Sequence, residues 1–483
     1  MNREAGEIER PSDAARRDAN AIAQSLSRLW QRLCKTYLPV APEDSIWSFS
    51  RAIKASDPEQ GWKLHVSANL LTACEVLERV APFLQAREVL FKAPSTLQWL
   101  SQLNCGLDRE YSQVGKFITV YPGSDEEAVF LARRLHKMTL GRSAPAVPFD
   151  LKFRPDSSVY YRYGGFKALE IINPDGTRTP AIRNQNGELI SDLCKDGAAR
   201  PVWISDPFIN QQTRRKPKMI ENPFSTNLLV LRALSQRGKG GVYQGIDLSD
   251  SKPRLCIIKE GRHGGEIGWD GRDGNWRVRN EEWVLRSLRV AGLNVPRTYS
   301  SFELERNYYL VTEFIEGDTL QRRLNKRKRR LSITQALRYG HEIARLISKI
   351  HAAGWAWRDC KPANLLVTTK GELRPVDFEG ACPLDKPDPL PWNTPEFSPP
   401  EWQDACAPQS RIAEDIYAVG AVMHYLLTGR WLDASSRVRL SELRPNVPAF
   451  VCALVSDMVA SDPQQRPSAR CLTDKFKAAL SLA

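Results

Sequence analysis

Four short segments in the second half of this 483-residue chain constrain its fold more than any other feature. They are, in chain order, RGKGGVYQG (237–245), CIIKEG (256–261), WRDCKPANLLV (357–367) and PVDFEGA (375–381). The first is a glycine-rich turn between two strand-like runs, where glycines let backbone amides approach a phosphate. The others supply a strand lysine and then Asp and Asn side chains in loops, which suit phosphate and Mg²⁺. Each signal alone is weak, but together they predict a phosphate-transfer site.

In order and spacing these segments match the protein-kinase signature set, and residues 226 to 475 resemble a protein kinase. SPPEW (398–402), Asp415 in EDIYAVG and Arg466 in DPQQRPS stand where that family has further motifs. The resemblance implies a bilobal kinase fold over residues 226–483, with an N-lobe over 226–315 and a C-lobe over 316–483. It also implies phosphoryl transfer to Ser or Thr with ATP or GTP and Mg²⁺.

The resemblance assigns roles to residues of this sequence. The residues expected to bind the nucleotide lie in the glycine-rich turn, at the strand lysine and its helix partner, and in the hinge between the two lobes. They are Gly238, Gly240, Gly241, Lys259, Glu281, Glu313 and Ile315. Asp359 would orient or deprotonate the substrate hydroxyl, and Lys361 would touch the γ-phosphate. Asn364 and Asp377 would hold Mg²⁺, and Thr312 would be the gatekeeper.

Two details of this assignment carry alternatives. The partner of Lys259 is Glu281 or Glu282; Glu281 is preferred because Val284, Leu285 and Leu288 then take core positions of the helix. Three residues also depart from the family pattern, namely Tyr243 in the glycine-rich turn, Trp357 before Arg-Asp, and Glu379 after Asp-Phe. None of the three removes a group that touches phosphate or metal, so we expect a competent kinase.

The first half predicts a mixed α and β unit over residues 1–165. Apolar spacing indicates helices over 14–37, 69–85 and 125–138, and strand-like runs occupy 62–70, 87–94 and 115–122. Residues 166–225 predict short strands in a connecting segment. The expected fold class is therefore α+β and multidomain.

Cations recur on the strand-like runs of this unit. Lys63 and His65 alternate, so they point to one strand face, and Lys92, Lys116 and Arg162 lie on other runs. Taken singly, each lysine is equally well explained as a solvent-exposed strand residue, and His65 as a buried histidine of the core, as by a functional role. Taken together, they make a plausible anion pocket.

The runs WKLHVSAN, FK, GKFITVYP and YYRYGGF are similar to the N-terminal lyase domain of class III and IV lanthipeptide synthetases. That domain is itself similar to phosphothreonine lyases. The similarity continues through ISDPF (204–208) and into the kinase, at GGVYQGID, IIKEGR and DFEGA. It implies that Lys92 is a base, His65 an acid, and Lys63 and Arg162 clamps for phosphate or carbonyl, with Lys116 a weaker candidate.

The resemblance implies a bifunctional peptide dehydratase acting on a ribosomally made precursor peptide with a leader. The kinase would phosphorylate Ser or Thr, and the lyase would eliminate the phosphate to give dehydroalanine or dehydrobutyrine. The chain ends soon after Arg466, so we expect any ring-forming cyclase to be a separate protein. Two alternatives remain: a signalling Ser/Thr kinase with a phosphopeptide-binding N-terminal domain, and a non-catalytic scaffold.

Charge and composition limit the classes of partner and the cell compartment that we expect. The net charge of +13 favours anionic partners such as phosphopeptides and nucleotides. No nucleic-acid motif accompanies the basic run at 326–330, so no nucleic acid is expected as a partner. The ten cysteines form no CxxC pair, no apolar run is long enough to span a membrane, and the N-terminus has no secretory h-region. We therefore expect a cytoplasmic protein with reduced thiols.

Overall fold

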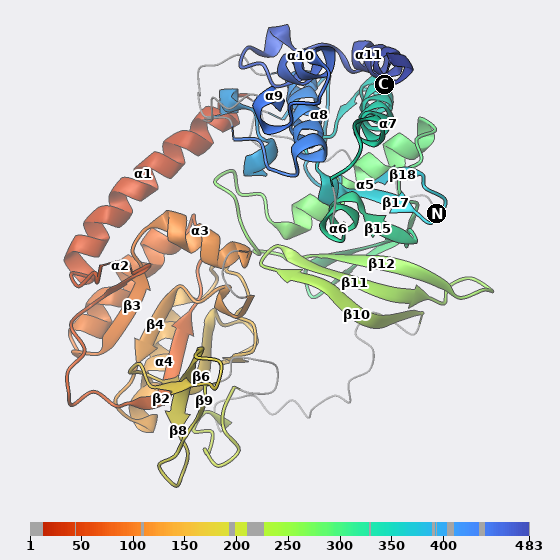
Figure 1. Cartoon of the computed structure of the whole chain (residues 1–483). Coiled ribbons are helices and arrows are strands. Elements are labelled where there is room, and N and C mark those ends of the chain that lie inside the picture. The colour runs from red at the N-terminus through yellow and green to blue at the C-terminus, as the bar shows by residue number, and fades with distance from the viewer. Residues whose placement is uncertain are drawn as a thin grey trace.

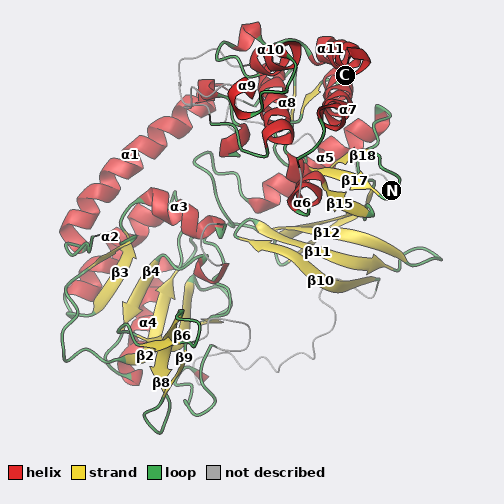
Figure 2. Ribbon diagram, viewed as in Figure 1, coloured by secondary structure: helices red, strands yellow, loops and turns green. Residues whose placement is uncertain are grey.

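The computed structural model describes residues 13–43, 45–107, 111–192, 199–209, 227–327, 330–388, 392, 394–402, 410–433 and 440–482. It contains an N-terminal α and β domain followed by a two-lobed unit, which confirms the expected α+β class (Figure 1). Helices gather in the last third of the chain, the N-terminal domain combines helices with a sheet, and strands predominate among the described residues between 151 and 261 (Figure 2).

The N-terminal domain is built on a six-stranded sheet in the order β1-β3-β4-β2-β6-β5. All its pairings are antiparallel. Its strands are β1 (Trp47–Phe49), β2 (Gln60–Val66), β3 (Leu90–Pro94), β4 (Ile118–Tyr121), β5 (Leu151–Lys152) and β6 (Val159–Gly165). Trp62, Leu64 and Val66 of β2 are buried in the domain's apolar core, which leaves Lys63 and His65 on the other face.

Four helices accompany this sheet: α1 (Asp13–Tyr37), α2 (Ala73–Gln85), α3 (Leu97–Cys105) and α4 (Asp125–Thr139). Strand β2 ends at Val66, and α2 begins only at Ala73, because the Asn69 side chain accepts hydrogen bonds from the backbone of Leu71 and Thr72. The helix expected from residue 69 therefore begins four residues later, at Ala73. No helix was expected where the short α3 lies.

The segment expected to connect the two units folds onto the N-terminal domain. It forms the small sheet β7 (Glu170–Ile172), β8 (Arg178–Arg183) and β9 (Leu189–Ser191). The Tyr163 amide donates to the Ala199 carbonyl at 2.8 Å, and the Phe208 ring stacks on Tyr161 with centroids 4.0 Å apart. These long-range contacts make residues 166–192 and 199–209 part of that domain; residues 193–198 and 210–226 lie outside the described residues.

The N-lobe of the second unit is a five-stranded antiparallel sheet in the order β10-β11-β12-β14-β13, with α5 packed against β12 and β14. Its elements are β10 (Leu228–Arg237), β11 (Gly240–Asp247), β12 (Arg254–Gly261), α5 (Gly274–Val290), β13 (Thr298–Leu304) and β14 (Asn307–Glu313). The glycine-rich turn joins β10 to β11, so its tip lies at one end of the sheet.

The C-lobe is mostly helical. It comprises β15 (Gly317–Thr319), α6 (Leu320–Asn325), α7 (Ile333–Ala352), β16 (Trp355–Ala356), β17 (Leu365–Thr368), β18 (Leu373–Pro375), β19 (Cys382–Pro383), α8 (Arg411–Thr428), α9 (Leu440–Leu443), α10 (Ala449–Met458) and α11 (Ala469–Leu482). A capping box between Ser332 and Gln335 starts α7, and α8 is buried on nearly all sides. No helix in the described ranges is long and apolar enough to cross a membrane.

Candidate active sites

The strand register gathers four of the expected residues on one face of the N-terminal sheet. Lys63 of β2 pairs with Arg162 of β6, and His65 pairs with Thr119 of β4. Thr119 also pairs with Lys92 of β3. Because residues directly opposite each other in a ladder share a face, Lys63, His65, Lys92 and Arg162 line one surface.

Two carboxylates complete this cluster. Asp150, just before β5, has a fully buried side chain and lies 2.5 Å from His65 Nδ1 and 3.6 Å from Lys116 Nζ. Asp192, just after β9, pairs with Arg162 and lies 3.9 Å from Lys63 Nζ. Neither was found by sequence reasoning, because both lie in loops without periodicity; the only signal was that buried cations need carboxylates nearby.

The cluster shifts the pKa values of its bases downward. Burial, assisted by the charges of Lys63 and Lys116, lowers the pKa of Lys92 to about 7. Burial lowers the pKa of Lys63 to about 8 against the attraction of Asp192. The same cause lowers the pKa of His65 to about 4 although Asp150 opposes it. A lysine with a pKa near neutrality can act as a base.

Lys92 has a distinctive environment. Its Nζ lies 4.3 Å from the centroid of the Trp47 ring and 5.8 Å from that of Phe49, both on the neighbouring strand β1. No salt bridge joins Lys92 to a carboxylate among the described residues. The side chain is therefore held by aromatic rings, and its charge is opposed by other cations.

The kinase-like site pairs its lysine with acids. Lys259 Nζ donates to both oxygens of Glu281, at 2.7 and 2.6 Å, and to Asp377 Oδ1 at 3.0 Å. Although burial opposes the charge, Asp377 and Glu281 raise the pKa of Lys259. Glu282 instead bonds Arg286, Ser301 and Tyr308, so the geometry selects Glu281 as the partner.

The loop before β17 forms a second cluster. Lys361 Nζ lies 2.9 Å from Asp359 Oδ2, and Asn364 Nδ2 donates to the same oxygen at 2.7 Å. The Thr394 hydroxyl donates to Asp359 Oδ1 at 3.0 Å and accepts from Lys361 Nζ at 2.9 Å. Because the Asn364 amide nitrogen is used here, its oxygen remains for a cation, and Asn364 and Asp377 line one cavity of about 190 Å³. Two hard oxygen donors in one cavity fit Mg²⁺.

Two departures from the kinase pattern have structural counterparts. Trp357 donates from its ring nitrogen to the Asp377 carbonyl at 3.0 Å and stacks on Phe378, so it supports the loop that carries Asp377. Glu379 pairs with Lys239 at the tip of the glycine-rich turn. That ion pair holds the turn over the site.

The structure gives the expected glycines and hinge residues further roles. A Cβ at Gly238 would lie 1.6 Å from the Asn104 carbonyl oxygen, and one at Gly240 would lie 1.8 Å from that of Glu260. Close backbone approach therefore requires glycine at both positions, and at Gly238 the neighbour is the N-terminal domain. At Gly241 a Cβ would meet the ring of Tyr243. In the hinge, Ile315 is buried, and the Glu313 side chain pairs with Arg374 at 2.7 and 3.0 Å.

Two of the expected C-lobe motif residues, Asp415 and Arg466, anchor loops of the kinase-like site. Asp415 accepts from the backbone amides of Trp357 and Arg358 at 2.9 and 2.6 Å, which anchors the loop that carries Asp359. Arg466 makes a bidentate ion pair with Glu401 of SPPEW at 2.6 and 2.7 Å. Both contacts are buried and fix the active-site loops to the helical core.

Comparisons with known proteins divide the chain in the same way. Residues 40–219 match the family model of the RamC N-terminal domain, and residues 237–476 match that of the protein kinase domain. The chain is 29% identical over 389 residues to the probable SapB synthase of Streptomyces coelicolor, covering 77% of this chain and 40% of that protein.

Ser/Thr kinases match the second unit. The chain is 25% identical over 237 residues to the probable serine/threonine-protein kinase PknB of Lactococcus lactis, covering 47% of this chain and 36% of that protein. It is 28% identical over 227 residues to the serine/threonine-protein kinase F of Synechocystis, covering 42% of this chain and 44% of that protein. The chain thus spans less than half the length of each of these relatives.

Proposed function

Because this chain joins a RamC N-terminal domain to a protein kinase domain, we propose that it is a two-step peptide dehydratase. The kinase domain transfers phosphate from a nucleoside triphosphate to Ser or Thr of a precursor peptide. The N-terminal domain then eliminates that phosphate and leaves dehydroalanine or dehydrobutyrine. The similarity to a probable SapB synthase supports a peptide substrate.

In the first step, Lys259, held by Glu281, binds the α- and β-phosphates. Asp359 orients the acceptor hydroxyl and takes its proton as the hydroxyl oxygen bonds to the γ-phosphorus. The bond between the γ-phosphorus and the β–γ bridging oxygen breaks, and the nucleoside diphosphate leaves with that oxygen and the electrons of the bond. Asn364 and Asp377 would hold Mg²⁺, which neutralises phosphate charge. Lys361, 2.9 Å from Asp359, is placed to stabilise the transferred phosphoryl group.

In the second step, the neutral Lys92 amine takes the Cα proton of the phosphorylated residue. The electron pair of that bond forms the Cα–Cβ double bond, and the Cβ–oxygen bond breaks. The phosphate leaves with both electrons of the broken bond, and protonated His65 gives its proton to the departing oxygen. Lys63 and Arg162 stabilise the charge that collects on the phosphate.

His65 must be protonated for this step. Burial lowers its pKa to about 4, which favours the neutral ring in the empty site. That pKa already includes the attraction of Asp150, 2.5 Å away. A bound phosphate anion adds a further negative charge near the ring and favours the imidazolium, so substrate binding prepares the acid.

The observation that carries the proposal is the Lys92 environment. A domain that only bound phosphopeptides would need charged lysines, whereas Lys92 is buried with other cations and its pKa is lowered to about 7. A lysine whose ammonium group loses its proton easily is better suited to abstracting a proton than to binding an anion.

The test is co-expression of the chain with short Ser/Thr-rich peptides encoded beside its gene, followed by intact peptide mass. We expect net loss of water with the natural chain. Peptides that gain phosphate and never lose it would contradict the lyase assignment and favour a kinase with a phosphopeptide-binding domain. Peptides that remain unchanged with every encoded partner would contradict the dehydratase as a whole.

A further inference from the structure

Asp388 lies in the loop that follows β19, and its side chain is almost completely buried. Two arginines from different lobes bind its carboxylate. Arg272 Nη1, from the N-lobe loop between β12 and α5, donates to Asp388 Oδ2 at 2.5 Å. Arg358 Nη1, from the catalytic loop beside Asp359, lies 3.5 Å from the same oxygen. Asp388 therefore links the N-lobe to the catalytic loop.

A third arginine holds the backbone at the same point. Arg411 Nε, at the start of α8, donates to the Asp388 carbonyl oxygen at 2.7 Å. Arg358 and Arg411 also share Glu414, whose Oε2 lies 3.4 Å from Arg358 Nε and 3.6 Å from Arg411 Nη1. Burial and the charge of Arg358 lower the pKa of Arg411. Buried like charges repel each other, so this cluster of arginines depends on its carboxylates.

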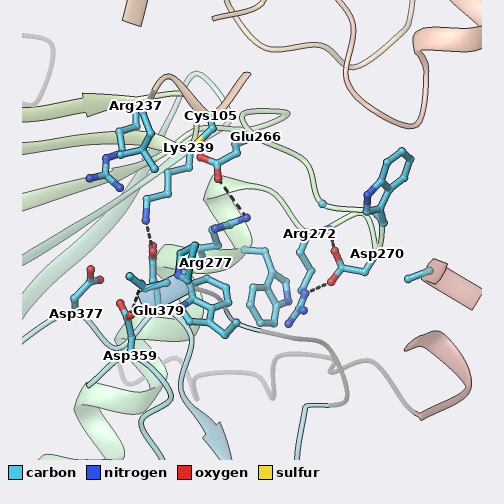
Figure 3. Close-up of a pocket in the computed structure, with 18 of the residues that line it drawn as sticks. Cys105, Arg237, Lys239, Glu266, Asp270, Arg272, Arg277, Asp359, Asp377 and Glu379 are labelled. Carbon is cyan, nitrogen blue, oxygen red and sulfur yellow. Dashed lines mark hydrogen bonds and ion pairs between the residues drawn. The ribbon is translucent and has the colours of Figure 1, made fainter. Parts of the chain in front are cut away.

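Arg272 is held in position by its own loop. It pairs with Asp270 (Figure 3), and its guanidinium carbon lies 4.5 Å from the centroid of the Trp276 ring. Trp269 of the same loop packs against the apolar core of the N-terminal domain. Because these contacts already restrict the Arg272 side chain, it loses little further freedom when it binds Asp388.

The arrangement around Asp388 does what phosphorylation does in other protein kinases. A phosphate added to the activation loop pairs with arginines and orders the loop, which brings the catalytic groups into place. In this chain a carboxylate makes the arginine pairs. The groups that such ordering controls are in place, since Lys259 contacts both Glu281 and Asp377.

We propose that Asp388 is a positioning residue that takes the place of an activating phosphate, so that the kinase domain is active without phosphorylation of the chain itself. Asp388 acts through Arg358, whose neighbour Asp359 orients the acceptor hydroxyl, and through Arg272, which joins the N-lobe to the same point. This inference rests on the proposed kinase step and adds how that step is kept switched on.

The first measurement uses the natural chain, treated with a protein phosphatase until its intact mass shows no phosphate. Phosphoryl transfer to a library of short peptides with a central Ser or Thr should keep its full rate. A rate that falls as phosphate is removed from the chain would overturn the proposal.

Substitutions then test the arginine pairs. Asp388→Asn keeps the size of the side chain and removes its charge, so we expect kcat for a library peptide to fall roughly tenfold, because buried arginines lose a carboxylate partner. The peptide KM should change little, and Asp388→Glu should restore part of the rate. Asp385→Asn, an exposed change in the same loop, is the matched control.

Arg272→Gln breaks the same contact from the other side. It should also lower kcat, and the double variant with Asp388→Asn should be less impaired than the product of the two single effects, because both changes remove one shared interaction. If Asp388→Asn fails to fold, Arg272→Gln decides the question.

Elimination from a synthetic phosphopeptide library should proceed at the natural rate in the variants that fold, which separates a kinase defect from a general one. A natural kcat in Arg272→Gln, or in a folded Asp388→Asn, would overturn the positioning role and leave the kinase step intact. Failure of the natural chain to phosphorylate any library peptide would overturn the proposed kinase step, and the role of Asp388 with it.

Discussion

Two lysines, each on a strand of a different domain, have opposite electrostatic environments. Lys259 touches Glu281 and Asp377, whose charges raise its pKa despite burial. Lys92 faces Trp47 and lies near Lys63 and Lys116, and its pKa falls to about 7. The difference shows that neighbours, not residue type, decide whether a lysine is a permanent phosphate clamp or a base.

The largest expected effect comes from removing the base. Lys92→Ala should slow elimination by roughly 10²–10⁴-fold, the usual contribution of general base catalysis. Phosphorylation should continue, so phosphopeptide should accumulate in the intact-mass assay.

Lys137→Ala, on an exposed face of α4, is the control and should behave as the natural chain does. Elimination that persists at the natural rate without Lys92 would remove it from the mechanism.

A smaller effect should follow from changing the residue that supports the acid. Asp150→Asn removes the charge beside His65 Nδ1 and so lowers the pKa of His65 further. Elimination should slow by roughly 10²-fold, and the defect should shrink as the pH is lowered, because acid restores the imidazolium. The measurement is the pH profile of elimination from a synthetic phosphopeptide library.

Asp156→Asn, an exposed carboxylate before β6, is the matched change and should leave that profile unaltered. A pH-independent defect in Asp150→Asn would mean that Asp150 supports only the fold.

The smallest effect should come from replacing Asp192, the carboxylate that contacts the two proposed phosphate clamps, Arg162 and Lys63. Asp192 pairs with Arg162 and lies 3.9 Å from Lys63 Nζ, so it competes with substrate phosphate for both cations. Asp192→Asn should tighten phosphopeptide binding by roughly 1 kcal/mol, about fivefold, as measured by the KM of elimination.

Asp175→Asn, in the exposed turn between β7 and β8, is the control. Weaker phosphopeptide binding in Asp192→Asn would show instead that Asp192 positions the clamps rather than competing with phosphate.

How far the sequence could predict these sites depends on what each residue contacts. Strand alternation placed Lys63 and His65 on one face, and motif order placed Lys259, Asp359 and Asp377 in one cleft. Asp150 and Asp192 could not be found, because nonlocal packing of loops brings them to the sheet.

The same limit applied to the fold. Apolar spacing found α1, α2 and α4, and residues 166–225 were expected as a connecting segment with short strands. The stacking of Phe208 on Tyr161, which joins part of that segment to the N-terminal core, has no local sequence signal. Gly238 was expected as a phosphate-loop glycine, and its close approach to the backbone of Asn104 likewise has no local sequence signal.

The most direct test of the contrast between the two lysines is their titration. Protein made with lysine labelled with ¹³C at Cε reports each ammonium by NMR, and the Lys92→Ala and Lys259→Ala variants assign the two signals. We expect Lys92 to titrate near pH 7 and Lys259 to stay charged throughout the range in which the protein is folded. A Lys92 signal that titrates near the ordinary lysine pKa of about 10.4 would contradict the assignment of this residue as the base.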